Sequence, residues 1–172
     1  IKPNRKKKKK KSKISLPIMK RIEDNIHASE LEVVEFLQKK WGVQIQYTGL
    51  NVFEKIDAYI FKDSSLKGIA EIKVRRQGYS WMKDYGSVVM SFQKIQIGAD
   101  LSRLLGVKFM AVTYTSDNKI ITFQITDEKG NIVCPMNIRN VEMKKDNINK
   151  SLVNAYLNLE DNKYCNVYHR GF

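Results

Sequence analysis

The hydrophobic residues of this chain follow a helical period near its beginning and a strand-like alternation after it. Between residues 15 and 42, apolar side chains recur about every 3.6 residues, which predicts a helix that ends at Gly42. Ser29, with Glu32 three residues later, could begin a second helix within this stretch. Residues 43–48, VQIQYT, alternate between apolar and polar side chains and predict a strand.

The stretch from residue 53 to residue 76 predicts two antiparallel strands that are joined by a polar turn. Turn-forming residues are concentrated in KDSSLKG, residues 62–68. Because side chains alternate across a strand, Glu71 and Lys73 share one face of the second strand. The antiparallel pairing brings Asp57, in the first strand, close to both of them.

The second half of the chain predicts further elements. Residues 91–105 have the apolar coverage of a well-buried helix, and residues 107–115 are an apolar run typical of a buried strand. Residues 77–90 contain glycines and aromatic residues without a clear period, and they predict a loop beside Glu71 and Lys73. The remaining predictions are a strand over 120–126, an edge strand over 132–138 and a terminal helix over 147–159.

This order of elements predicts one α/β domain that follows a charged arm. The domain covers residues 15–172, with a core over 30–125 and a C-terminal extension over 126–172. The arm, residues 1–14, is predicted to be solvated and disordered, because its first 13 residues hold eight Lys and one Arg and no acid.

The arm contributes most of the net charge of +13 and suggests a phosphate-rich partner. The predicted contacts of the arm with nucleic acid are Lys6, Lys7, Lys8, Lys9, Lys10 and Lys11. Two alternatives stay open: a nuclear-localisation signal, and a compositional bias in a chain that is also rich in Asn and Ile.

The composition argues against several other classes of protein. No apolar run approaches the roughly 20 residues that cross a bilayer, and no signal peptide is visible at the start. Cys134 and Cys165 have no metal-ligand spacing, the two histidines give little support for a zinc site, and no Gly-rich phosphate loop occurs. We therefore expect an intracellular protein without a membrane partner, in the cytoplasm of a bacterial or phage-infected cell or in a eukaryotic nucleus.

The acidic residues of the predicted hairpin suggest metal chemistry. Asp57 and Glu71 offer the two hard oxygen ligands that commonly hold a catalytic Mg²⁺, and Lys73 can orient a water or stabilise developing negative charge. An acid, a gap of about a dozen residues and then acid–apolar–lysine resembles the core motif of the PD-(D/E)XK nuclease superfamily. Ile56 stands where the leading proline of that motif would be.

The resemblance implies a restriction-endonuclease-like core, α-β-β-β-α-β, with a mixed central sheet flanked by helices. It implies a Mg²⁺-dependent endonuclease, with Mn²⁺ as a substitute, in which Asp57 and Glu71 bind the ion and Lys73 acts on the water. By the same resemblance, Gln93 supports Lys73 or the water, and Glu30 adds an acid to the metal site. The residues alone also allow Glu30 to be an exposed acid at the start of a helix.

The resemblance further implies DNA as the substrate, and RNA stays open. Small basic members of the superfamily include Holliday junction resolvases and phage-type endonucleases, and resolvases act as homodimers because two symmetric cuts need two sites.

Positive and aromatic side chains interleave over residues 75–85, a mixture that suits contact with a nucleic-acid backbone and stacking on bases. The predicted contacts are Arg75, Arg76, Tyr79, Trp81 and Lys83. As an alternative, Trp81 and Tyr85 pack beneath the predicted loop.

Two non-catalytic classes stay open from the residues alone. One is a basic nucleic-acid-binding protein that uses the Lys-rich arm and the Tyr79–Tyr85 loop, with Asp57, Glu71 and Lys73 as a surface ion pair. The other is a structural or assembly protein whose basic tail binds acidic partners. Metal-dependent cleavage separates the nuclease from both.

Overall fold

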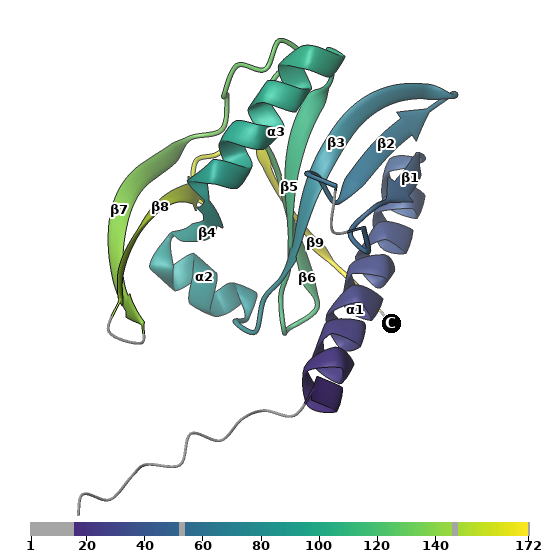
Figure 1. The fold of residues 1–172 in the computed structure, drawn as a ribbon. Helices are drawn as coiled ribbons and strands as arrows, with labels where there is room; N and C mark the ends of the chain where they lie inside the picture. Colours follow the sequence, from purple (N-terminus) through teal and green to yellow (C-terminus); the bar gives the residue numbers. More distant parts are fainter. Residues whose placement is uncertain (1–15, 52–53, 146–147, 172) are drawn as a thin grey trace, which may run out of the picture.

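The computed structural model of the protein describes residues 16–51, 54–145 and 148–171, which form an α/β fold with a mixed sheet and flanking helices (Figure 1). The first predicted helix is one continuous element, α1 (Leu16–Trp41). It is followed by β1 (Gln44–Tyr47) and by the predicted hairpin, β2 (Ala58–Lys62) and β3 (Ser65–Val74).

The larger sheet combines antiparallel and parallel pairing. Its strand order is β1-β2-β3-β5-β6-β9, where the last three are β5 (Lys108–Tyr114), β6 (Lys119–Gln124) and β9 (Cys165–His169). β3 and β5 run parallel, because α3 (Phe92–Leu105) lies between them in the chain and carries it back across the sheet. The other neighbouring strands are antiparallel.

The two faces of the larger sheet have separate cores. Ala70 and Ile72 point to the face that packs against Leu37 of α1, whereas Ile69 points to the face that packs against Ile95 of α3. Because side chains alternate along β3, Glu71 and Lys73 share one face, as the sequence predicted, and this is the face that packs against α3.

A close approach between α3 and the sheet depends on one glycine. A Cβ atom at Gly98 would lie 2.2 Å from the ring of Phe109 in β5, a distance that real Cβ contacts do not reach. Gly98 therefore lets the first turns of α3 lie close to β3 and β5.

The predicted loop over residues 77–90 is wrong, since it contains α2 (Tyr79–Tyr85) and β4 (Ser87–Ser91). A helix of seven residues is too short to show a period. The start of α2 is fixed by a residue that is distant in the sequence, because the Tyr79 backbone N–H donates to the Asp117 carboxylate at 2.9 Å. Gly86 ends the helix in the left-handed conformation, with φ of 83°.

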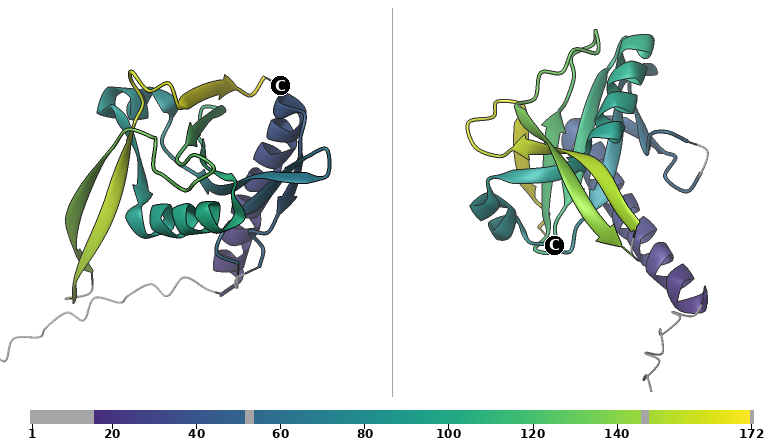
Figure 2. Two further views of the ribbon diagram at one scale, coloured as in Figure 1. Left: turned by 90° about the horizontal axis from the view of Figure 1, so that it is seen from above. Right: turned by 60° about the vertical axis from the view of Figure 1, so that its left-hand side comes forward.

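The terminal helix predicted over residues 147–159 is also wrong, since this segment forms β8 (Ile148–Asn158). β8 pairs on one side with β4 and on the other with β7 (Met136–Lys145) to make a second sheet. β7 overlaps the edge strand predicted over 132–138 only at residues 136–138. Figure 2 shows the β7–β8 hairpin standing away from the larger sheet. Strand pairing between distant segments overrides the local helical pattern here.

The C-terminal extension over 126–172 is thus part of both sheets, because β9 pairs with β6 and β8 pairs with β4. None of the helices in the described part of the chain is long and apolar enough to cross a membrane.

Candidate active site

The fold holds Asp57 against β3 through its backbone and its side chain. Asp57 directly precedes β2, and its backbone N–H donates to the carbonyl oxygen of Ala70 at 3.1 Å. Its Oδ2 accepts a hydrogen bond from the backbone N–H of Ile72 at 2.8 Å. Ala70 and Ile72 flank Glu71, so Asp57 is fixed next to the second predicted metal ligand.

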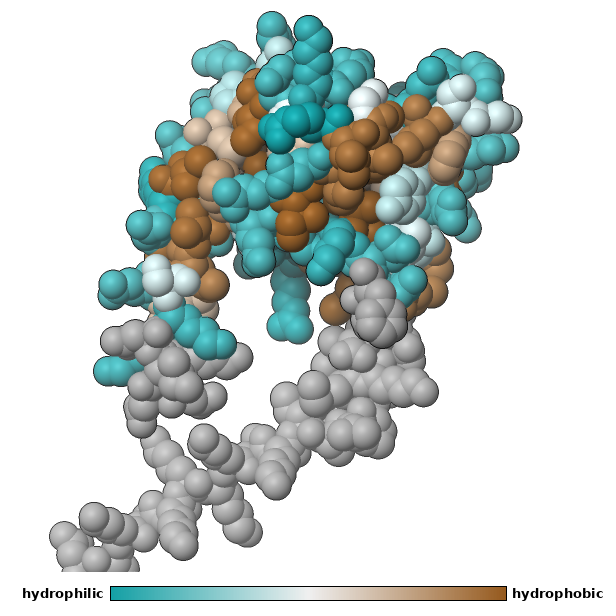
Figure 3. Space-filling model, turned by 45° about the horizontal axis from the view of Figure 1, so that its top comes forward, coloured by the Kyte–Doolittle hydropathy of each residue, from teal (hydrophilic) through white to brown (hydrophobic). Residues whose placement is uncertain are grey.

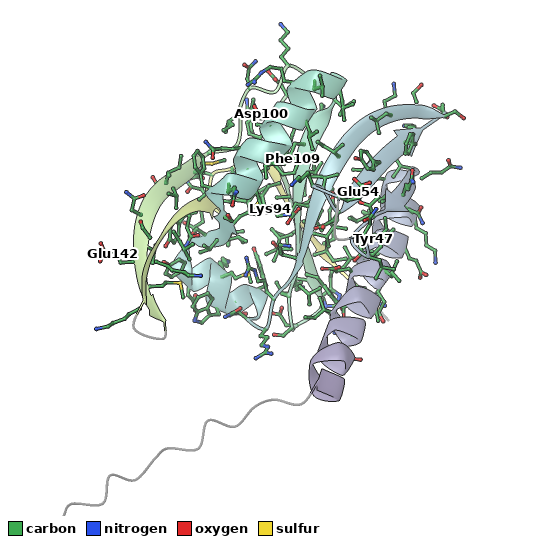
Figure 4. The ribbon with its side chains drawn as sticks, in the orientation of Figure 1. Tyr47, Glu54, Lys94, Asp100, Phe109 and Glu142 are labelled. Carbon is green, nitrogen blue, oxygen red and sulfur yellow. The ribbon has the colours of Figure 1, made fainter. Side chains whose placement is uncertain are left out.

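Glu71 is a fully buried carboxylate that faces two lysines. Its side chain is 0% exposed, and Lys73 Nζ lies 2.9 Å from its Oε1. Lys94, in the first turns of α3, places its Nζ 3.2 Å from Oε1 and 3.2 Å from Oε2 (Figure 4). The Lys73 and Lys94 side chains are 39% and 36% exposed, so the three charged groups contact solvent through the lysines and not through Glu71.

One oxygen of Glu71 takes part in both ion pairs. Oε1 is buried and lies 2.9 Å from Lys73 Nζ and 3.2 Å from Lys94 Nζ. The two ammonium groups therefore compensate the charge of this buried carboxylate. A divalent cation at Glu71 would add to this positive charge or replace part of it.

The charges of the site perturb one another. Burial raises the pKa of the Glu71 carboxyl, the Asp57 charge raises it further, and Lys73 and Lys94 oppose the rise. Burial by itself would lower the pKa of Lys73, but Glu71, Asp57 and Glu30 raise that pKa on balance. Lys73 is therefore held as an ammonium group between carboxylates.

Glu30 is a buried acid at the edge of this group. It lies on α1 and accepts a hydrogen bond from the hydroxyl of Tyr47 in β1, which Figure 4 labels. Burial, followed by this bond and the charge of Glu30, raises the pKa of Tyr47 well above its usual range. Glu30 thus belongs to the electrostatic environment of Lys73, and its role as a metal ligand stays a prediction.

The donor set fits a hard divalent cation with two protein carboxylates. Asp57, just before β2, and Glu71, in β3, offer carboxylate oxygens of the kind that Mg²⁺ and Mn²⁺ prefer. Among residues 16–51, 54–145 and 148–171, no three acidic, His or Cys side chains converge in a metal-holding arrangement. The remaining ligands would be waters and substrate oxygens, which is usual for Mg²⁺.

Lys94 is the site residue that sequence reasoning missed. Gln93, the predicted partner of Lys73, is exposed, and its neighbour Lys94 reaches Glu71. The sequence held a signal for Lys94 in its spacing from two small residues. Lys94 precedes Gly98 by four residues and Ser102 by eight, so the three lie on one side of the helix, and the two small residues are buried. A stripe of small residues marks the side of a helix that approaches a sheet closely.

The predicted nucleic-acid contacts divide into two groups. Arg75 is half-buried, and its Nη2 donates to the carbonyl oxygen of Val89 in β4 at 2.6 Å. The other predicted contacts lie on or near α2, where Tyr79 is half-buried and Arg76, Trp81 and Lys83 are exposed. The predicted contacts Lys6–Lys11 lie outside the described residues.

Comparisons of the chain with protein-family models, curated proteins and solved structures found no match. Its function is therefore inferred from its own residues and their geometry.

Proposed function

We propose that the protein is a metal-dependent nuclease that hydrolyses phosphodiester bonds in DNA. The observation that carries the proposal is the pair of adjacent carboxylates, Asp57 and the fully buried Glu71, with Lys73 beside them. Mg²⁺ is usually bound by one or two carboxylates where waters and substrate phosphate complete its coordination.

The order of elements supports a restriction-endonuclease-like core. α1, β1, β2, β3, α3 and β5 follow the order α-β-β-β-α-β, with β3 and β5 parallel and with α2 and β4 inserted before α3. Asp57 precedes β2 and Glu71 lies in β3, an arrangement that supports the resemblance to the superfamily motif.

A solvated ion pair explains the site less well. Such a pair stabilises a protein by at most about 1 kcal/mol and needs no burial, whereas Glu71 is removed from water entirely. Placing Asp57 next to it adds repulsion between like charges, which also raises the pKa of Glu71. Perturbed carboxyl groups of this kind are concentrated at functional sites.

Each residue has a separate task in the proposed reaction. Asp57 and Glu71 would hold the ion, which supplies Lewis-acid activation of the phosphate and a bound water of lowered pKa. Lys73 orients the attacking water and stabilises negative charge on the phosphate as it develops. Lys94, from α3, also neutralises Glu71, and Arg75 offers a cation two residues along from Lys73.

The competing function is a nucleic-acid-binding protein without catalysis. It is favoured by the exposed Trp81 and by the cations near α2, since neither needs a metal. In that case Asp57, Glu71 and Lys73 have a structural role only.

The proposal is tested by incubating the protein with supercoiled plasmid, linear duplex and four-way-junction DNA, with Mg²⁺ or Mn²⁺ and with a chelator. We expect cleavage in the presence of metal and none with chelator. Symmetric cutting of the junction would further indicate a homodimer. Binding of these DNAs without cleavage under any metal condition would favour the competing function.

The Lys-rich arm gives a separate prediction about affinity. Deleting residues 1–13 should weaken binding to all DNA sequences alike, because Lys and Arg contact phosphates without reading bases. The slope of log K against log salt should fall by roughly 0.9 for each phosphate contact removed from a duplex. Titrations at several salt concentrations measure this slope, and an unchanged slope would show that the arm does not touch DNA.

A further inference from the structure

Four side chains from three elements form a continuous stack on the surface, which we call the aromatic row. Trp81 and Tyr85 of α2 stack with ring centroids 5.4 Å apart and planes within 5° of parallel. Tyr156 of β8 follows, 6.3 Å from Tyr85, and the guanidinium of Arg139 in β7 lies 4.9 Å from the centre of the Tyr156 ring. The row thus joins α2 to the second sheet.

The outer end of the row is open to water. Trp81 is 55% exposed and Tyr85 is 50% exposed, although each ring could contribute substantial hydrophobic free energy if buried. Tyr85 contacts Trp81 through one ring stack and Tyr156 through a tilted ring contact, so it restricts the orientation of the Trp81 indole. A ring held in this way loses little conformational entropy when it binds a flat partner.

A cavity of about 130 Å³ lies between Trp81 and Arg75, and the side chain of Gln77 also lines it. It therefore combines an aromatic surface, a guanidinium and an amide, which are the groups that bind a base and its phosphate. A second cavity, of about 210 Å³, lies at the other end of the row and is lined by Asn137 and Arg139.

Arg75 connects the row to the candidate active site. Arg75 follows Lys73 by two residues. Its backbone N–H donates to the carbonyl oxygen of Tyr114 in β5 at 2.8 Å, so the chain remains extended as far as Arg75. Extended residues two apart point to the same side and lie roughly 7 Å apart. A strand that contacts Trp81 and Arg75 is thereby directed toward Lys73 and Glu71.

The charge around the row suits a polyanion. Residues 75–89 include three cations, Arg75, Arg76 and Lys83, and one acid, Asp84. Arg139 adds a further cation at the inner end. Ile138, Met143, Leu152 and Val153 of the β7–β8 hairpin are exposed apolar side chains, and Figure 3 shows hydrophobic surface on the left of the molecule, the side on which this hairpin lies in Figure 1.

We propose that the aromatic row binds an unpaired DNA strand, with a base stacked on Trp81 and the adjoining phosphate at Arg75. This inference rests on the proposed function, and it names the substrate class as DNA with a single-stranded segment beside the bond that is cut. Tyr85, Tyr156 and Arg139 are positioning residues, because they hold Trp81 rather than the base.

The test is equilibrium binding of labelled oligothymidine, the matching duplex and oligouridine in the presence of chelator, so that no cleavage occurs. Trp81→Leu keeps an apolar side chain but removes the ring, and it should weaken oligothymidine binding by roughly 5-fold to 150-fold. Trp81→Phe keeps a ring and should restore most of the affinity. Tyr85→Leu should weaken binding by a smaller factor. Thermal melts establish that each variant is folded.

A control variant is Leu104→Ser, which removes a more exposed apolar side chain from the far end of α3. It should bind oligothymidine like the wild type. Equal oligothymidine binding by Trp81→Leu and wild type, no binding of oligothymidine by the wild type, or tighter binding of oligouridine than of oligothymidine would each overturn the proposal. Self-association that Trp81→Leu abolishes while DNA binding stays intact would instead assign the row to a second copy of the chain.

The two proposals fail in different ways. If Trp81→Leu loses oligothymidine binding but the wild type cuts no DNA with any metal, the nuclease proposal is wrong, and the proposal that the aromatic row binds an unpaired strand is supported. If the wild type cuts DNA and Trp81→Leu binds and cuts every substrate like the wild type, the proposed role of the aromatic row is wrong, and the nuclease proposal is supported.

Discussion

Replacing Glu71 by Gln, or Asp57 by Asn, is expected to reduce the rate of DNA cleavage by roughly a thousandfold or more, since metal activation supplies several kcal/mol of transition-state stabilisation. Both substitutions keep the size of the side chain and remove only the charge that holds the ion. Glu71→Gln leaves Lys73 and Lys94 without their shared carboxylate, but both lysine side chains reach solvent, which limits the loss of stability, and thermal melts check that the variant is folded. Single-turnover cleavage measures the effect, and DNA binding in chelator should be nearly unchanged.

The matched control is Asp100→Asn, which neutralises an exposed acid that pairs with Arg103 on α3, away from the sheet. Its cleavage rate should equal that of the wild type. If Glu71→Gln or Asp57→Asn cleaved DNA at the wild-type rate, neither carboxylate could be a metal ligand of the reaction.

Lys73→Ala is expected to slow cleavage by roughly 100-fold or more while leaving metal and DNA binding in place, because a preorganised cation would be lost where negative charge develops. Lys73→Arg should restore little of the rate. The guanidinium is larger and planar, and it presents its donors as a fixed fork rather than as a compact ammonium. Single-turnover cleavage and thermal melts of the wild type and both variants distinguish loss of rate from loss of fold.

Lys108→Ala serves as the control for Lys73. Lys108 is similarly exposed and also pairs with an acid, Glu128, at 3.5 Å, but it lies at the other end of the parallel strands. Its loss should change neither rate nor affinity. If Lys73 only neutralises its neighbours, Lys73→Arg should behave like the wild type, and Lys73→Ala should cost at most about 1 kcal/mol of stability.

The hairpin that carries Glu71 was predictable because its signals are local. The turn-forming residues over 62–68 and the alternation around Glu71 each constrain one segment, and the structure has an antiparallel hairpin there. Its bounds differ from the prediction: β2 begins at Ala58, after Asp57, and β3 already begins at Ser65, within the predicted turn. The helix over 91–105 was predictable for the same reason, since its apolar coverage and Gly106 are properties of the segment itself.

The second sheet was not predictable, because it depends on contacts between distant segments. β8 pairs with β4, whose partner residues lie 63 to 71 positions earlier in the chain, and α2 begins where Asp117 reaches Tyr79. The aromatic row has the same origin: Trp81 and Tyr85 are close in sequence, but Tyr156 and Arg139 join them only through this sheet. Lys94, by contrast, carried a local signal in Gly98 and Ser102 that pointed to the sheet-facing side of its helix.

The most direct test of the central claim is calorimetric titration of Mg²⁺ or Mn²⁺ into the wild type and into the double variant Asp57→Asn, Glu71→Gln, without DNA. The site geometry predicts metal binding by the wild type that the double variant loses, because both oxygen ligands lose their charge. Equal metal affinity of the two proteins would contradict the assignment of Asp57 and Glu71 as the metal site.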